Sequence, residues 1–243
     1  MNEFDDIRPY YDSEVVAVLS KLSSSSEFID TLLSIKYPRL GRWIPWLVRP
    51  VISYSLHSAF ARMKTVSDLH DVMRISFGKL LTETGSTLTV SGLENLDRKT
   101  PYLFISNHRD IAMDPAFLNV ALIDDGRDSV RIAIGDNLLT KEFVSDLARV
   151  NKSFIVKRSV KGRREKLTAL TKLSRYIRCS LTEDKSSVWI AQREGRAKNG
   201  MDKTEPALLK MLSLSKKKSQ TFETGFRELN IVPVAISYEF DPL

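Results

Sequence analysis

The chain has 243 residues and a formal net charge of +7, from 37 Lys and Arg against 30 Asp and Glu. A hydrophobic content of 42% is enough for a buried core in a chain of this length. The excess of basic residues favours an anionic partner, such as a phosphate, a coenzyme or an anionic lipid surface. The single cysteine, Cys179, excludes an intrachain disulfide and has no neighbours in sequence that would complete a metal site, so we expect no metal.

The acidic N-terminus is not followed by an apolar run, so we expect no signal peptide. No stretch reaches the ~18 consecutive apolar residues of a membrane-spanning helix. We therefore expect contact with a membrane to be peripheral. The basic residues are spread over loops without interleaved aromatic residues, so we expect no nucleic-acid partner.

Apolar residues recur at spacings of three and four through residues 9–82, which predicts helices at 12–22, 27–36 and 66–82. Residues 37–54 hold Trp43 and Trp46 with flanking arginines and three prolines. We expect the prolines to break this stretch into short pieces. The two indoles have two open interpretations: the headgroup zone of a bilayer, or packing between helices of a bundle.

From residue 86 onward, expected strands and helices alternate, which predicts an α/β domain at 86–243 after an N-terminal helical region at 1–85. The domain would hold a largely parallel or mixed sheet covered by helices. The chain stops directly after the last expected strand, which suggests a sheet domain truncated at its C-terminus. We expect strands at 86–90, 102–105, 130–134, 154–156, 188–191 and 231–237, and helices at 115–123, 135–148, 166–181 and 206–214.

The turn between the expected strand at 102–105 and the helix that Pro115 opens contains His108, Asp110 and Asp114. A histidine beside a carboxylate can act as a general base, because the carboxylate holds the tautomer of the ring. The plainer interpretation is that His108 is a polar surface residue and that Asp114 caps the helix.

Basic residues follow two further expected strands: 157–158 comes after 154–156, and 193–198 comes after 188–191. If the strands are parallel, these loops meet His108 at one edge of the sheet. The plainer interpretation of each loop is a solvated charged segment.

At that edge Arg158 and Arg196 would clamp a phosphate, because the guanidinium group offers a planar fork of donors. Gly195 would let the backbone approach a ligand closely, and Glu194 would orient one of the two arginines.

Four blocks of this sequence, in order and spacing, resemble those of the glycerolipid acyltransferases. The family comprises the glycerol-3-phosphate and lysophosphatidic acid acyltransferases. The resemblance covers about residues 86–240, and the runs 156–162 and 232–239 look closer to the glycerol-3-phosphate branch. The blocks are Asn107-His108 with Asp114, then 154–158, then Glu194-Gly195-Arg196, then 231–234.

The resemblance implies an enzyme that moves a fatty acyl group from acyl-CoA or acyl-carrier protein to a hydroxyl of glycerol-3-phosphate or a lysophospholipid. It implies no cofactor beyond that donor. It also implies phospholipid biosynthesis at the cytoplasmic face of a membrane, with peripheral attachment. His108 matches the family's general base and Asp114 its orienting carboxylate, and the implied substrate-binding residues are Arg158, Glu194, Gly195, Arg196, Lys157 and Asn107.

The sequence departs from the family's pattern at two places. The family's aspartate usually stands five residues after the histidine, where this chain has Met113. Either Asp114 reaches back to His108 or Asp110 takes the role, and we favour Asp114. An aromatic-proline pair often precedes the family's glutamate, but Gln192-Arg193 stands here. These departures support an alternative function, a non-catalytic relative that binds membranes or lipids and keeps the fold.

Overall fold

The computed structural model describes residues 3–37, 43, 45–84, 86–197 and 201–239. Contacts divide the chain into two compact units, which we call the α/β unit and the helical unit. The α/β unit takes its residues from 1–8, 81–137 and 154–243, and the helical unit from 9–80 and 138–153. Each unit therefore combines segments that are far apart in sequence. The division into domains after residue 85 stays a prediction.

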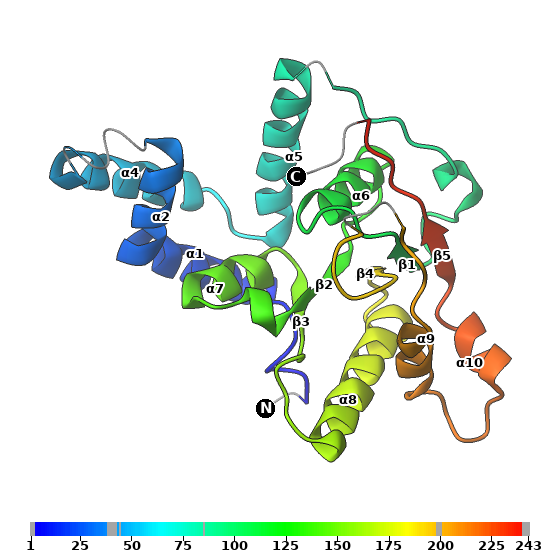
Figure 1. Ribbon diagram of the computed structural model, residues 1–243. Helices are drawn as coiled ribbons and strands as arrows, with labels where there is room; N and C mark the ends of the chain where they lie inside the picture. The colour runs from blue at the N-terminus through cyan, green and yellow to red at the C-terminus, as the bar shows by residue number, and fades with distance from the viewer. Residues whose placement is uncertain (1–2, 38–42, 44, 85, 198–200, 240–243) are drawn as a thin grey trace. The chain divides into compact units, whose positions relative to one another are not determined.

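The α/β unit is built on a five-stranded parallel sheet with the order β3-β2-β4-β1-β5 (Figure 1). Strand β1 pairs in parallel with β4 and with β5, and β2 pairs in parallel with β4. This confirms the expected α/β fold. The strands are β1 (Leu103–Ser106), β2 (Arg131–Gly135), β3 (Ser153–Val156), β4 (Val188–Ala191) and β5 (Ile231–Val234).

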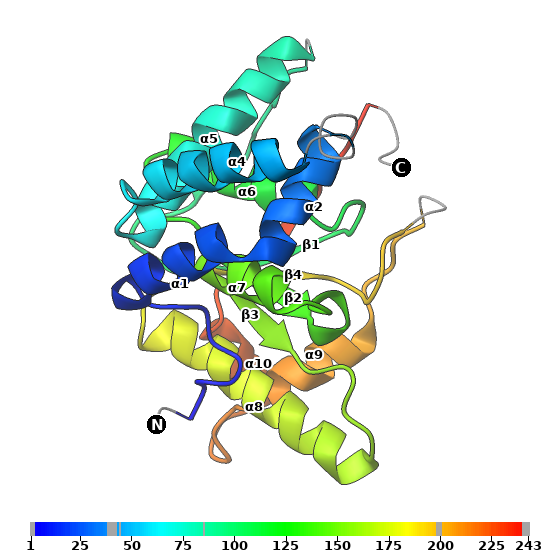
Figure 2. The same cartoon turned by 90° about the vertical axis from the view of Figure 1, so that its left-hand side faces the viewer.

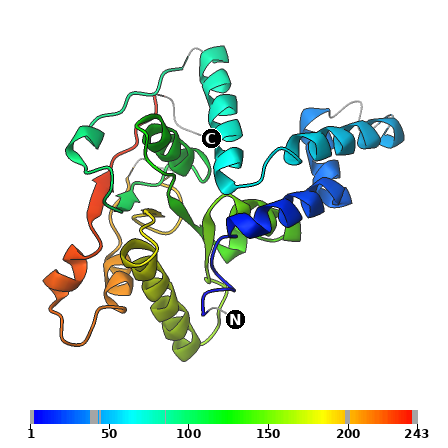
Figure 3. The same ribbon diagram turned by 180° about the vertical axis from the view of Figure 1, so that it is seen from behind.

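Helices cover both faces of this sheet, because successive side chains of a strand point to opposite faces. Leu103 of β1 belongs to a core with α8 (Arg163–Thr182) and α9 (Pro206–Ser213). Phe104, the next residue, packs instead with Leu118 and Leu122 of α6 (Met113–Asp124). Figure 3 shows the strands between α6 and α8. Burial on both faces explains why these strands are short apolar runs.

Several segments of the α/β unit differ from expectation. The strand expected at 231–237 ends at Val234, and a 3-10 turn stands where a helix was expected to open at residue 135. Residues 86–90 form no strand, although their polar and apolar residues alternate; they are mostly exposed and no strand pairs with them. A short helix, α10 (Phe222–Arg227), was not expected and is capped by the side chain of Thr221. The 3-10 turn η1 (Leu93–Asn95) also lies in this unit, and η2 (Asp136–Leu138) stands at the boundary with the helical unit.

The helical unit confirms the expected N-terminal helices. Helices α1, α2 and α4 contact one another, and Figure 2 shows them side by side. Helix α7 joins their core through Phe143 and Val150, although the sequence places it among the strands. The helices are α1 (Asp12–Ser24), α2 (Ser26–Lys36), α4 (Pro45–Phe60), α5 (Val66–Glu83), whose last residues belong to the α/β unit, and α7 (Glu142–Val150).

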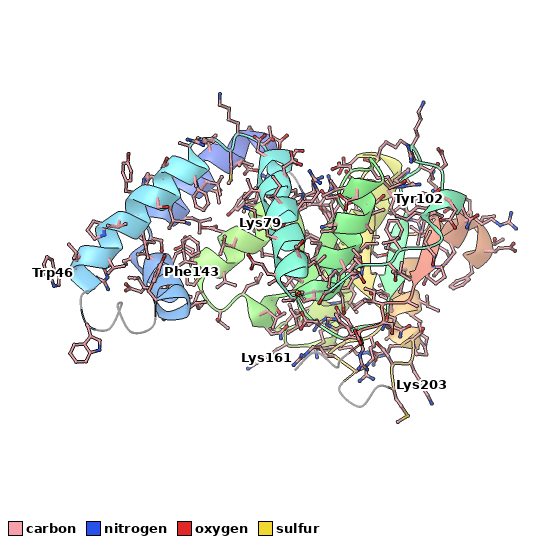
Figure 4. The ribbon with its side chains drawn as sticks, turned by 90° about the horizontal axis from the view of Figure 1, so that it is seen from above. Trp46, Lys79, Tyr102, Phe143, Lys161 and Lys203 are labelled. Carbon is pink, nitrogen blue, oxygen red and sulfur yellow. The ribbon has the colours of Figure 1, made fainter. Side chains whose placement is uncertain are left out.

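Helix α4 corrects the prediction that its prolines break the stretch into short pieces. The helix runs continuously through Pro50, and the carbonyl that Pro50 leaves without a partner belongs to the exposed Trp46. Trp43 and Trp46 are 83% and 73% exposed, so packing inside a helical bundle is excluded for both indoles. Figure 4 shows the Trp46 side chain directed away from the helices. None of the helices in the described ranges is both long and apolar enough to cross a bilayer.

Candidate active site

The loop between β1 and α6 brings the imidazole of His108 against the carboxylate of Asp114. Nδ1 of His108 lies 3.1 Å from Oδ2 of Asp114. The Asp114 side chain is completely buried, whereas that of His108 retains 13% exposure. Because the carboxylate engages Nδ1, the tautomer that donates to Asp114 presents Nε2 as an acceptor. No side chain or backbone group of the described residues forms a hydrogen bond with Nε2.

The Asp114 carboxylate accepts hydrogen bonds on both of its oxygens. Oδ2 also accepts from the backbone N–H groups of Arg109 and Asp110, and Oδ1 accepts from the Tyr238 hydroxyl at 2.7 Å. Burial alone would raise the pKa of Asp114, but the bonds from His108, Tyr238 and the backbone outweigh it and lower that pKa below its ordinary value. Burial and the Asp114 charge raise the pKa of Tyr238. Asp114 is therefore held as the anion that an imidazolium requires.

Asp110 has a different task, which settles which carboxylate faces His108 in this structure. Oδ1 of Asp110 accepts from the N–H groups of Ala112 and Met113 at 2.8 and 2.7 Å. These bonds tighten the turn that leads into α6, which begins two residues before Pro115. Asp114 lies within the first turn of α6 and does not cap the helix, and its carboxylate bonds the imidazole instead.

Backbone contacts tie the His108 loop to the segment that follows β4. The backbone N–H of Ala197 donates to the carbonyl of His108, and that of Gln192 donates to the carbonyl of Ser106. The N–H of His108 in turn donates to Oδ2 of Asp202 at 2.5 Å. The backbone of His108 is therefore held at both its N–H and its C=O.

The ring of Trp189 packs against the imidazole of His108. The ring of Trp189 meets that of His108 edge-on, with 6.2 Å between centroids. Its indole N–H donates to the Ser106 hydroxyl at 2.9 Å, and only 2% of Trp189 is exposed. The Trp189 ring therefore restricts the imidazole of His108 on one side. It offers no acceptor that would compete for the protons of the imidazole.

The structure brings the expected arginines to the same edge of the sheet as His108. One guanidinium nitrogen of Arg158 lies 3.3 Å from Oε1 of Glu194, so these two side chains form an ion pair. Arg196 lies 3.9 Å from Oδ2 of Asp110, in the His108 loop. The loops after β1, β3 and β4 are thus linked through side chains, and both arginines keep part of their surface open to solvent.

Gly135, the last residue of β2, and Asp136, which follows it, hold Arg158 in place. Asp136 accepts from the backbone N–H of Arg158 at 3.0 Å and from the N–H and hydroxyl of Ser159. Burial acts to raise the pKa of Asp136, but these bonds prevail and lower it. At Gly135 an added Cβ would clash with Asn137 Oδ1 and stand 3.1 Å from Arg158 Cδ, so the absent side chain leaves room for both residues. Gly195 has φ of +76°, a conformation that glycine adopts without strain.

Two expected substrate-binding residues, Lys157 and Asn107, bond to other residues of the protein. The Lys157 ammonium pairs with Asp6; burial acts to raise the pKa of Asp6, but its bonds to lysines, that of Lys157 first, lower it. The side-chain amide of Asn107 bonds both the N–H and the C=O of Ile236, at 2.7 and 2.8 Å. Asn107 therefore fixes the segment that carries Tyr238. A direct contact of Lys157 or Asn107 with substrate stays a prediction.

Three residues of this site were missed by sequence reasoning. Asp136 directly follows β2, just as His108 follows its own strand closely, and this position was a usable signal. Tyr238 and Asp202 lie 124 and 94 residues from their partners, and no local pattern marks them.

No cluster of His, Cys, Asp and Glu that could hold a metal ion occurs among the residues described. Burial, followed by a contact with Glu183, raises the pKa of the Cys179 thiol, so this cysteine is a poor nucleophile.

The sequence and the fold can be set beside those of known proteins. A family model described as Acyltransferase matches residues 87–237, which is more than half of the chain. Among solved structures, the 1-acyl-sn-glycerophosphate acyltransferase PlsC from Thermotoga maritima is 13% identical with a TM-score of 0.43, over 82% of this chain and 69% of that one. Chloroplast FtsY from Physcomitrella patens is 16% identical with a TM-score of 0.30, over 95% and 71%.

A search of curated proteins gave no match. The family match spans all four sequence blocks, from His108 to the strand at 231–234, and confirms the resemblance at the level of the family. The preference for the glycerol-3-phosphate branch stays a prediction. On this match over residues 87–237, the chain belongs to the acyltransferase family.

Proposed function

We propose that the protein transfers a fatty acyl group from an acyl thioester to a hydroxyl of glycerol-3-phosphate or a lysophospholipid, with His108 as general base. The observation that carries this proposal is the His108–Asp114 pair, in which Nδ1 and not Nε2 engages the carboxylate. Arg158 and Arg196 stand at the same edge, where the phosphate of such an acceptor would be neutralised.

The proposed reaction is a direct transfer. Nε2 of His108 takes the proton of the acceptor hydroxyl while the hydroxyl oxygen attacks the thioester carbonyl carbon. The C–S bond then breaks, and the leaving thiolate receives the proton from the imidazolium. Asp114 stabilises the imidazolium through Nδ1, and this kind of proton transfer contributes about 10²–10⁴-fold to the rate. Placement of acceptor and thioester together supplies the rest.

We propose further that the protein works at the cytoplasmic face of a membrane, in phospholipid biosynthesis, with peripheral attachment. The support is the exposed aromatic and apolar surface at α4, next to Arg49. Aromatic rings beside an arginine suit the headgroup zone of a bilayer. The exposed residues are Trp43, Trp46, Leu47, Val51 and Tyr54.

The test is a thioester-release assay against a panel of acceptors, with acyl-CoA and acyl-carrier protein as donors. The His108→Ala variant should lose transfer while its circular dichroism and thermal unfolding match those of the wild type. Unchanged turnover in this variant would overturn the proposed function.

The alternative is a non-catalytic relative that binds lipids or membranes. The shifted position of Asp114 and the absence of the aromatic-proline pair before Glu194 favour it. It predicts binding to anionic vesicles with no consumption of thioester from either donor. The His108–Asp114 contact weighs against it, because a protein that only binds lipid has no use for an oriented imidazole.

A further inference from the structure

The first turns of α8 form an exposed, basic extension of the α/β unit, which we call the α8 arm. We define it as Lys161, Arg163, Arg164, Lys166, Leu167 and Leu170. Every residue from 161 to 168 is exposed, so the helix begins beyond the core that buries its second half. Glu165 is the one acid among residues 157–170.

The basic side chains of the α8 arm are not neutralised within the part of the chain that the structure describes. Across those ranges no ion pair involves Lys161, Arg163, Arg164 or Lys166, whereas Lys172, further along α8, pairs with Asp6. Four cations against Glu165 leave a net positive surface. Such a surface attracts an acidic partner and raises its rate of association.

One face of the arm combines this charge with apolar surface. Arg163, Lys166, Leu167 and Leu170 stand at spacings of three, four and seven, which places them on one side of a helix. Leu167 is 55% and Leu170 39% exposed. The same four residues, with Gly162, line an open hollow of about 530 Å³. A hollow with two leucines and two cations can receive an apolar side chain from an acidic helix.

The arm also begins at the edge of the sheet where the proposed chemistry takes place. Helix α8 follows β3 and Arg158, and in a parallel sheet the connecting helices start at the carboxyl ends of the strands. Figure 4 shows Lys161 on the same side of the α/β unit as Lys203, from the segment after β4. A partner that binds the arm would therefore present its acyl group at the edge of the sheet that carries His108.

We propose that the α8 arm is the docking surface for an acidic acyl-carrier protein that delivers the acyl thioester. This inference rests on the proposed function, since it names the donor for that site. Charge complementarity and the concave apolar surface favour a protein helix over a lipid surface. The arm carries no aromatic residue, in contrast to the exposed surface of Trp43 and of Trp46 in α4.

The experiment compares two charge-reversed variants that have the same net charge. Arg163→Glu with Lys166→Glu alters the arm. Lys217→Glu with Lys218→Glu is the matched control, because these lysines are exposed in the loop between α9 and α10. Initial rates are measured with palmitoyl-loaded bacterial acyl-carrier protein and with palmitoyl-CoA, at saturating glycerol 3-phosphate.

The arm variant should raise KM for the carrier protein at least about tenfold, with the KM for palmitoyl-CoA and kcat unchanged. The control variant should change neither. Leu167→Gln leaves the charge of the arm unchanged. It should raise KM for the carrier protein without changing KM for palmitoyl-CoA. An unchanged KM for the carrier, or equal losses with both donors, overturns the proposal.

Binding without turnover separates this inference from the proposed function. Titration of the His108→Ala variant with the carrier protein should show binding, which the two arm substitutions abolish and the control preserves. No transfer from any donor would defeat the proposed function and leave this binding test standing. Transfer from palmitoyl-CoA with no binding of the carrier would overturn docking alone. If the arm substitutions weaken binding to anionic vesicles instead, the arm is a membrane surface and the proposal is wrong.

Discussion

The hydroxyl of Tyr238 donates to Oδ1 of Asp114, the carboxylate oxygen that does not contact His108. The loop after β1 thus supplies both the imidazole and its carboxylate partner, and Tyr238, 124 residues after Asp114, adds a hydrogen bond to that carboxylate. The phenol also packs beside Phe117 of α6, with 5.7 Å between ring centroids. The ionised state of Asp114 therefore depends on the segment that follows β5.

Tyr238→Phe should reduce stability mainly at neutral pH. The folded-state pKa of Asp114 is lowered, so its contribution is present above the unfolded pKa and is lost as pH falls through the folded pKa. Removal of one donor makes that pKa less depressed. We expect a loss of about 1–2 kcal/mol at pH 7 that shrinks in acid, measured by urea unfolding across pH. Tyr54→Phe, at an exposed tyrosine, is the control. A loss of stability that does not vary with pH would contradict this account.

Asp114→Ala and Asp110→Ala should separate catalysis from stabilisation of the turn that leads into α6. The first removes the partner of the imidazole and should lower kcat by about 10²-fold or more. The second removes the bonds to the N–H groups of Ala112 and Met113, and should cost about 1 kcal/mol of stability. Its kcat should stay within a few-fold of the wild type. Steady-state rates and thermal unfolding measure both effects, and the opposite ranking of kcat would assign the imidazole to Asp110.

Asp136→Asn should weaken binding of the acceptor. The substitution removes the charge that accepts bonds from Arg158 and Ser159, so the loop that aims Arg158 loses its anchor. We expect KM for a phosphorylated acceptor to rise by up to about tenfold with little change in kcat. Asp71→Asn, on the exposed surface of α5, provides the control. A fall in kcat at unchanged KM would show that Asp136 does not act through the acceptor.

Trp43→Ala with Trp46→Ala should impair attachment to membranes. Both indoles are exposed, so their removal creates no cavity and should leave stability nearly unchanged. Loss of two aromatic groups from the interface should weaken binding to anionic vesicles by at least about tenfold. Vesicle sedimentation measures the effect, with Val90→Ala as the control at an exposed apolar residue of the α/β unit. Equal sedimentation of variant and wild type would show that the two indoles at α4 do not take part in membrane binding.

The core of the α/β unit was predictable because short apolar runs such as Leu103–Ser106 are buried on both faces. The same local signal misled at residues 86–90, where alternation exists but no neighbouring strand pairs. Pairing is a property of the whole chain. Helix α7 shows this again, since it lies between β2 and β3 in the chain but packs in the core of the helical unit.

The candidate site was predictable where a side chain follows its own strand closely. His108, Arg158 and Glu194 all do so, and parallel strands bring such positions together. Tyr238 and Asp202 were not predictable, because each acts on a residue that only the folded chain brings near. Lys157 looked equivalent to Arg158 in sequence, but the N-terminal Asp6 pairs with it.

The turn closed by Asp110 takes up one more residue than the family's spacing allows, and the imidazole still meets its carboxylate at Asp114. The contact is thus preserved while the distance along the chain varies. A search pattern that fixes the aspartate at five positions after the histidine would overlook this chain. A pattern that also accepts an Asx turn followed by an aspartate six positions after the histidine matches it.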